Sequence, residues 1–246
     1  MKGSDNSKVR MFKGHLNSTG HMVGKKYGCP EATQGEEGCE EPCYADDIVK
    51  QYPSVKEKML KAYLELKECT TTEEYYAVIQ PTVQKSYDQY LRRLKRKDID
   101  PKELRRLKQR GHIFRWHWAG DVIAVEHAKA IAQIAKDYPD TTFWIYTRTW
   151  WAVGAMRHIK NLAVYLSVDD VNESMMLKLR QEMPDVGLAL LKEKGEDKTD
   201  KKLWRNEHKR TIVTCPATNG RLKSDGACVT CGACFNSTID VVFLKH

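Results

Sequence analysis

The sequence lacks any run of about eighteen apolar residues, the length that a membrane-spanning helix needs. Its first residues, MKGSDNSKVRMFKGHLNS, lack the apolar stretch of a secretory signal peptide. It also contains no internal repeat and no low-complexity tract, which argues against solenoid and disordered proteins. Together these absences predict a soluble, cytoplasmic protein that has no membrane partner.

The composition is that of a globular chain with a basic excess. Its 246 residues are 41% hydrophobic, which is enough to bury one sizeable core. Because α/β domains of about 250 residues are common, we expect a single domain spanning residues 1–246. The formal net charge of +8 favours an anionic partner, and a nucleotide or nucleic acid is the expected class. The sequence gives no indication of an oligomeric state.

A regular alternation of strand and helix patterns begins at residue 112. It is typical of βαβ units with a parallel sheet, and we expect an α/β fold, a partial (β/α)6 barrel resembling a TIM barrel. The expected strands are 112–121, 141–149, 162–170, 186–192 and 211–215. The expected helices are 125–140, 151–161 and 172–185, and residues 193–210 are expected to form a charged connector.

A different pattern precedes this alternation. Residues 48–111 have helical periodicity and are expected to form a helical insertion. Within it, residues 85–110 contain eleven Lys or Arg and four Asp or Glu. Such a run is typical of a solvated helix face, but it could also face the phosphates of a nucleic acid around Arg92, Arg93, Arg105 and Arg106.

Four of the eight cysteines lie near the C-terminus. In a reducing cytoplasm cysteines stay as thiols, so their spacing favours metal binding or catalysis over disulfides. Three of the four form a CxxCxxC motif, which favours a [4Fe–4S] cluster, while structural zinc is the alternative. We therefore interpret residues 215–246 as a cluster-binding segment with the ligands Cys215, Cys228, Cys231 and Cys234.

Three other cysteines, Cys29, Cys39 and Cys43, share a short loop with no obvious fourth ligand, because Cys69 lies in the helical insertion. Three thiolates on a four-iron cluster leave one iron open, and an open position can bind and activate a small molecule. The alternatives are a zinc site completed by His15 or His21, and three unrelated thiols.

Polar residues follow three consecutive expected strands. In parallel α/β folds the carboxyl ends of strands carry the chemistry. Arg148 could grip a carboxylate or phosphate, and Asp169 could act as acid, base or nucleophile. Each of these residues could instead have a purely structural role. His117 could be a core histidine, Asp121 a helix cap and Arg148 a member of a structural ion pair. The expected catalytic residues are His117, Asp121, Arg148 and Asp169.

The motif Cys39-x3-Cys43-Tyr44-Ala45, followed by a helix and a βα series, resembles the radical S-adenosylmethionine superfamily. In that superfamily three cysteines after the first strand ligate a [4Fe–4S] cluster, usually spaced CxxxCxxC. Here Cys29, ten residues upstream of Cys39, would supply the third. The resemblance implies that Asp121 binds the amino group of S-adenosylmethionine, and the cofactor-binding residues expected here are Gly120, Asp121, Tyr146 and Ser167.

The order of motifs also resembles the phage family catalogued as gene product 88, usually of unassigned function. That resemblance implies a place in the cytoplasm of the host cell. Ala119 and Val122 stand where the family more often has Ser and Phe. The shared motifs are Asn6-Ser7-Lys8, Cys29-Pro30, Cys39-x3-Cys43-Tyr44-Ala45, RWHWAGD at 115–121, YTRTW at 146–150, LSVD at 166–169, and CPA at 215–217 followed by CVTCGAC at 228–234.

These observations leave three functional hypotheses. The first is an iron–sulfur enzyme that modifies a nucleotide or nucleic acid. The second is a barrel resembling the deazaguanine transglycosylases of tRNA or DNA, with structural zinc at the C-terminal cysteines and with Asp121 and Asp169 as acid, base or nucleophile. The third is a metal-stabilised nucleic-acid-binding protein without enzymatic activity.

Overall fold

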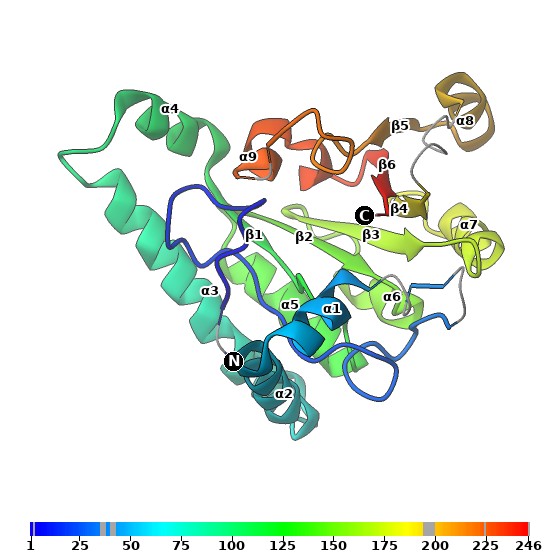
Figure 1. Cartoon of the computed structure of the whole chain (residues 1–246), viewed down its shortest axis with the longest axis horizontal. Coiled ribbons are helices and arrows are strands. Elements are labelled where there is room, and N and C mark those ends of the chain that lie inside the picture. Colours follow the sequence, from blue (N-terminus) through cyan, green and yellow to red (C-terminus); the bar gives the residue numbers. More distant parts are fainter. Residues whose placement is uncertain (2, 35–37, 40–42, 194–199, 224, 246) are drawn as a thin grey trace.

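The structure is a computed structural model that describes all residues except 2, 35–37, 40–42, 194–199, 224 and 246. Its centre is a six-stranded parallel sheet in the order β1-β2-β3-β4-β6-β5 (Figure 1). The five expected strands are confirmed, but the sequence reading missed β6, which lies inside the segment assigned to metal binding. The strands are β1 (His112–Arg115), β2 (Thr141–Thr147), β3 (Leu162–Val168), β4 (Gly187–Lys192), β5 (Thr211–Thr214) and β6 (Ile239–Leu244).

The sheet is open, with β1 and β5 at its two edges. The expected parallel α/β fold is therefore confirmed, whereas the barrel stays a prediction. At the β1 edge the N-terminal segment continues the sheet for a short distance, because Ser18 forms a parallel bridge with Arg115. At the β5 edge, β6 lies between β4 and β5. The segment that joins β5 to β6 packs against one face of the sheet.

The expected insertion at 48–111 is helical, although its first helix begins four residues earlier than expected, at Tyr44. Thr71 caps α3 in a reciprocal pair with Glu74, and Asp100 caps α4 ahead of Pro101. Residues 201–208 of the charged connector form a helix, and residues 194–199 lie outside the described residues. The helices are α1 (Tyr44–Gln51), α2 (Pro53–Lys67), α3 (Thr72–Leu94), α4 (Pro101–Arg110), α5 (Val125–Asp137), α6 (Val153–Met156), α7 (Glu173–Glu182), α8 (Lys201–His208) and α9 (Ala227–Cys231), with the short 3-10 helices η1 (Trp150–Ala152) and η2 (Ala233–Phe235).

Side chains alternate between the two faces of the sheet. On one face, Phe143, Ile145 and Val164 belong to the large core that includes residues of α3, α5, α6 and α7. On the other face, Trp144 and Tyr165 pack in a second core with residues of α4, α9 and η2. Figure 1 shows α5 and α6 on one side of the sheet and α9 on the other. None of the helices in the described ranges is long and apolar enough to span a bilayer.

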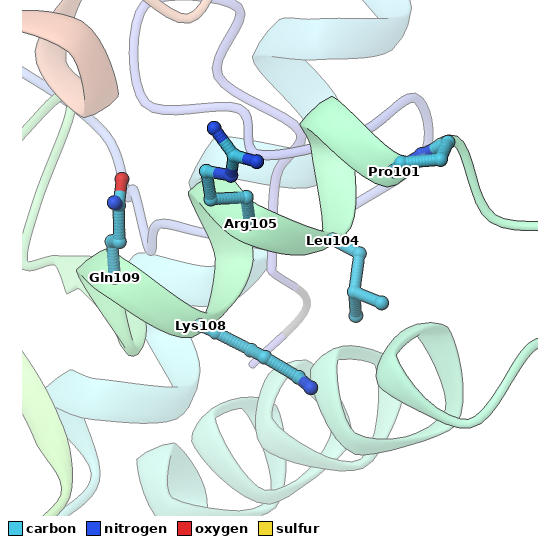
Figure 2. Close-up of a pocket in the computed structure, with 5 residues that line it drawn as sticks. All are labelled: Pro101, Leu104, Arg105, Lys108 and Gln109. Atoms are coloured by element: carbon cyan, nitrogen blue, oxygen red, sulfur yellow. The ribbon is translucent and has the colours of Figure 1, made fainter.

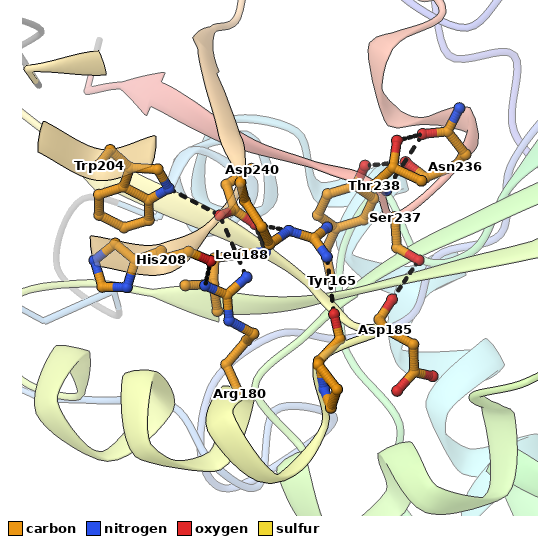
Figure 3. A network of polar contacts seen from close by, with 12 residues as sticks. Tyr165, Arg180, Asp185, Leu188, Trp204, His208, Asn236, Ser237, Thr238 and Asp240 are labelled. Carbon is orange, nitrogen blue, oxygen red and sulfur yellow. Dashed lines mark hydrogen bonds and ion pairs between the residues drawn. The ribbon is translucent and has the colours of Figure 1, made fainter. Parts of the chain in front are cut away.

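Asp240 is fully buried at the start of β6 and joins four elements (Figure 3). Its Oδ1 accepts a hydrogen bond of 2.9 Å from the backbone N–H of Leu188, and its Oδ2 accepts one of 2.9 Å from Trp204 Nε1. Arg180 Nη1 lies 3.6 Å from Oδ2, and Arg210 Nε lies 3.3 Å from Oδ1. The carboxylate thus balances two guanidinium groups that β4, β6, α7 and α8 enclose.

Replacing Asp240 with Asn should destabilise the protein by about 3–5 kcal/mol, because it leaves two partly buried guanidinium groups without a counter-ion. Chemical denaturation monitored by circular dichroism measures this loss. The matched control is Asp98→Asn, which breaks the exposed pair with Arg96 and should change stability little. Equal effects of the two substitutions would show that burial of the Asp240 pairs does not matter.

Candidate functional site

Asp121, after β1, is the centre of a buried polar cluster. Its Oδ1 accepts hydrogen bonds from the backbone N–H of Val122 (2.7 Å) and from Thr147 Oγ1 (2.5 Å). Its Oδ2 accepts one from the backbone N–H of Arg148 at 2.7 Å. Burial raises the pKa of Asp121, while these hydrogen bonds oppose the shift. The carboxylate therefore ties the end of β1 to the end of β2.

Asp121 does not cap the following helix. Helix α5 begins at Val125 after Ala124, and no side chain caps it. The alternative that Asp121 is a helix cap is therefore wrong. The adjacent Gly120 has φ 77°, and a Cβ at this position would lie 2.4 Å from Cε1 of His21. Glycine is therefore required at this position both by its backbone conformation and by the close approach of the His21 ring.

Arg148 and Asp169 form a buried ion pair, with Arg148 Nη1 2.8 Å from Asp169 Oδ2. Thr33 Oγ1 donates to the same carboxylate oxygen at 2.5 Å, and Arg148 Nη1 lies 3.3 Å from Thr33 Oγ1. The other oxygen of Asp169 accepts from the backbone N–H of Asn172 at 3.1 Å. The structural ion pair considered for Arg148 is present, and it joins the ends of β2 and β3 to the cysteine loop.

Three of the four expected catalytic residues, Asp121, Arg148 and Asp169, are thus brought together in one hydrogen-bonded chain. A hollow of about 280 Å³ opens beside Thr33 and Asn172. Its other lining residues come from the N-terminal loop and from the start of α7: Lys25, Glu31, Ala32, Gln34, Val171, Met175 and Met176. The hollow therefore borders Thr33 and Asn172, two residues that bond to Asp169, while Asp169 itself is buried behind them.

His117, the fourth expected catalytic residue, lies in an adjacent buried cluster with His21 and His127. The centroid of its ring is 5.0 Å from that of His21 and 5.1 Å from that of His127. Nδ1 of His117 lies 3.2 Å from Thr19 Oγ1, while Nε2 has no hydrogen-bond partner in the described part of the chain. Burial lowers the pKa of His21 to about 4 and that of His127 to about 3. These rings are therefore neutral at pH 7.

His127 was missed by sequence reasoning, because it stands in an ordinary helical pattern and only the fold brings it to the other two rings. His21 was noticed only as an alternative zinc ligand. The backbone of His117 has φ 48°, a conformation that few residues other than glycine adopt. A catalytic role of His117 stays a prediction.

Tyr146 and Ser167, two of the expected cofactor-binding residues, lie on the sheet face that α9 and η2 cover only in part. Toward the amino ends of the strands this face is buried, as at Trp144 and Tyr165. Toward their carboxyl ends Tyr146, Ser167 and the neighbouring Arg115 are half-buried. The Arg115 guanidinium lies over the Tyr146 ring, 5.0 Å from its centroid. We call this region the open face.

The three N-terminal thiols lie close enough to affect one another. Burial raises the pKa of Cys29, and the Asp121 carboxylate, Cys43 and Cys39 raise it further. Burial likewise raises the pKa of Cys43, to which Cys39 contributes. Cys29 and Cys43 pack against a small apolar cluster that includes residues of α1 and α2. The loop thus gathers the thiols beside Asp121, although residues 40–42 lie outside the described residues.

The C-terminal thiols form a second group. Burial raises the pKa of Cys228 to about 11 and that of Cys234 to about 12, and the other thiols of the group add to both shifts. Nevertheless, across the described residues no set of three or more His, Cys, Asp or Glu side chains is arranged to hold a metal ion. Metal binding at either group, including the ligands Cys215 and Cys231, therefore stays a prediction.

The neutral histidine cluster should make the protein sensitive to acid. A histidine whose pKa falls from 6.5 to about 3 on folding binds protons only in the unfolded state between these values, so stability is lost as pH falls below 6.5. For His127 alone, the loss between pH 7 and pH 5 should be about 2 kcal/mol. The variant His127→Gln should lose correspondingly less, as measured by urea denaturation at both pH values.

The control for this prediction is His158→Gln, because the His158 side chain is 68% exposed. It should keep the pH dependence of the natural protein. If His127→Gln and His158→Gln show the same pH dependence, the buried cluster does not determine the acid sensitivity.

Comparisons with known proteins agree with the gene product 88 resemblance. The Gene 88 protein of Mycobacterium phage L5 is 27% identical over 239 residues, which cover 94% of this chain and 87% of that protein. The Gene 88 protein of Mycobacterium phage D29 is 27% identical over 238 residues, with the same shares covered. No solved structure matches the chain, and the radical S-adenosylmethionine resemblance stays a prediction. Because the model of the family described as Gene product 88 matches residues 2–237, the chain belongs to that family.

Proposed function

We propose that this protein is an iron–sulfur enzyme, similar in architecture to the radical S-adenosylmethionine enzymes, that modifies a nucleotide or nucleic acid. The observation that carries the proposal is that one loop holds Cys29, Cys39 and Cys43 beside the buried polar cluster. Cys29 and Cys43 pack in the same small apolar cluster, and the backbone N–H of Cys39 donates to Thr33, which bonds to Asp169. Thiols crowded in this way are more stable as ligands of a cation than as free thiolates, and thiolates are the usual ligands of iron–sulfur clusters.

The position of the cysteine loop supports the proposal. The chain runs parallel to β1 at Ser18 and enters the loop directly afterwards. The backbone N–H of Asp121 donates to the carbonyl of Gly28 at 2.6 Å, so the loop begins at the carboxyl end of the sheet. Loops at this end carry the active site in parallel α/β proteins. In a partial barrel, the open face would form the inner wall below this loop.

Cys29, Cys39 and Cys43 would hold a [4Fe–4S] cluster with one open iron, which would supply a binding position for S-adenosylmethionine and one-electron chemistry driven by an external reductant. This chain would supply the groups that orient the ligand. Asp121 Oδ2 accepts one hydrogen bond from the protein, which leaves it able to accept another from an ammonium group. Tyr146 and Ser167 lie on the open face near the carboxyl ends of β2 and β3, while Arg148 and Asp169 brace these strand ends.

The same geometry disfavours the transglycosylase alternative. A carboxylate that acts as nucleophile or base needs a free oxygen facing the substrate. Asp169 already accepts from Thr33, Asn172 and Arg148, and it is only 1% exposed. Asp169 therefore serves better as a brace of the site than as its reacting group.

The C-terminal thiols would hold a second cluster or a zinc ion. Cys215 follows β5, while Cys228 and Cys234 pack against the partly covered face of the sheet. A metal at this group would fix α9 and η2 on the sheet beside the open face. The role of this metal would then be structural, because it would hold the segment between β5 and β6, residues 215–238, against the sheet.

The charge distribution supports a nucleotide or nucleic-acid substrate. Residues 85–110 contribute a net +7, from eleven basic and four acidic residues, to the chain total of +8. Arg93 and Arg96 are paired with Glu103 and Asp98. Figure 2 shows Arg105 and Lys108 on α4 beside a shallow hollow of about 380 Å³. The basic side chains of this segment that have no acidic partner among the described residues include Arg92, Lys95, Lys97, Lys102, Arg105 and Lys108.

The cluster assignment predicts the metal content of cysteine variants. Purified without oxygen, the protein should be brown and should contain about eight iron atoms per chain, or about four if zinc fills the C-terminal group. Cys39→Ala should lose about four of them, because two thiolates cannot hold the open cluster. Cys231→Ala should lose only the metal of the other group. Iron, sulfide and zinc analyses measure each of these losses.

Cys69→Ala is the matched control, since the Cys69 thiol lies outside both groups and bonds to the carbonyl of Glu65. It should keep all of the metal. A colourless anaerobic preparation with zinc and no iron would refute the iron–sulfur proposal and leave the zinc-containing alternatives.

The basic segment makes a separate prediction about nucleic-acid binding. Reversing two charges with Arg105→Glu and Lys108→Glu should weaken the affinity for a single-stranded oligonucleotide by about tenfold and reduce its salt dependence. Fluorescence anisotropy at several salt concentrations tests this. The control is Lys58→Glu with Lys61→Glu, an equal charge change on α2. If both pairs of substitutions weaken binding equally, α4 is not the binding surface.

A further inference from the structure

Arg115 differs from the other arginines that lie against the sheet. Arg148 pairs with Asp169, Arg157 with Asp185, and Arg180 with Asp240. Across the described residues, Arg115 forms no ion pair with a carboxylate, and its buried Nε has no hydrogen-bond partner. Its neighbours are neutral groups: the phenol rings of Tyr44 and Tyr146 and the thiol of Cys228.

Arg115 is half-buried, and burying its Nε–H without a hydrogen-bond acceptor or a nearby counter-ion is costly. The chain nevertheless places Arg115 at the carboxyl end of β1, on the open face, near Cys228 and near Tyr44, the residue that follows Cys43. Such a position is expected where an anionic ligand supplies the missing charge. The guanidinium fork matches the oxygens of a phosphate group, with which it can form two parallel hydrogen bonds.

Aromatic groups beside Arg115 suit the rest of a nucleotide. The Tyr44 side chain is 46% exposed, and its ring centroid lies 6.5 Å from that of Trp118. Exposed aromatic rings next to a phosphate-binding arginine are a common surface for a stacked base. The net positive charge of the chain also favours an anionic ligand over a neutral one.

We propose that Arg115 binds a phosphate group of the nucleotide substrate, with the base near Tyr44 and Trp118. The proposal rests on the proposed function, because it names the substrate class of the same site. It assigns Arg115 a binding role, in which the guanidinium fixes the substrate between the two cysteine groups. The phosphate can belong to a free nucleotide or to a polynucleotide.

Calorimetric titration with adenosine 5′-monophosphate and with inorganic phosphate tests the proposal. Arg115→Gln should weaken the binding of both probes at least tenfold, and Arg115→Lys should weaken it less, because it keeps the charge but loses the fork. The control is Arg205→Gln, which removes an exposed positive charge from α8, outside the basic segment, and should leave binding unchanged. Unaltered phosphate binding by Arg115→Gln would overturn the proposal.

A second measurement does not require a substitution at Arg115 to fold. In the natural protein, the ¹H–¹⁵N resonance of the Arg115 side-chain Nε, assigned from triple-resonance spectra of that same protein, should shift when phosphate is added. No shift at saturating phosphate would also overturn the proposal. The proposal would also be overturned if Arg115→Gln lost metal but still bound phosphate. Arg115 would then serve to neutralise the cysteine thiolates that hold the metal.

The source of the phosphate can be identified in the same variants. If the substrate is a polynucleotide, Arg105→Glu with Lys108→Glu should weaken oligonucleotide binding and leave the binding of adenosine 5′-monophosphate unchanged. If it is a free nucleotide, oligonucleotides should not compete with the monophosphate. Phosphate binding is measured separately from iron and sulfide, so failure of the cluster assignment and failure of the Arg115 proposal can be told apart.

Discussion

A series of backbone hydrogen bonds between residues 17–28 and 115–121 positions every part of the candidate site. The N–H groups of Arg115, Trp118 and Asp121 donate to the carbonyls of Asn17, Thr19 and Gly28, and His21 donates to Ala119. These bonds hold the cysteine loop at the carboxyl end of the sheet. They require close backbone approach, which explains why Gly28 and Gly120 both lie against the His21 ring, where a Cβ would collide.

The strands and the site were predictable to different degrees. Hydrophobic runs bounded by turn residues revealed five strands, because buried parallel strands have a strong apolar pattern. The run IDVVFL of β6 has the same pattern, but it was read as part of the cysteine segment. The convergence of Asp121, Arg148 and Asp169 followed from the rule for strand ends. Their mutual hydrogen bonds did not, since Thr33 and Thr147 reach them only through tertiary packing.

The buried charges and the surface charges of the protein have different roles. Inside the fold, Asp169 and Asp240 each balance at least one guanidinium, which is the condition under which buried charges are tolerated. On the surface, the net positive charge is concentrated on the end of α3 and on α4. Arg110 of α4 donates to the carbonyl of Thr230 in α9, so this basic surface adjoins the C-terminal cysteines.

The insertion of β6 between β4 and β5 has a consequence for folding during synthesis. On the ribosome, β5 emerges before β6, yet its only neighbour in the six-stranded sheet is β6. Strand β5 therefore has no strand partner in this sheet while residues 215–238, which include the C-terminal cysteines, are translated. During this interval β4 is a temporary edge with free backbone groups, open to pairing with another nascent chain.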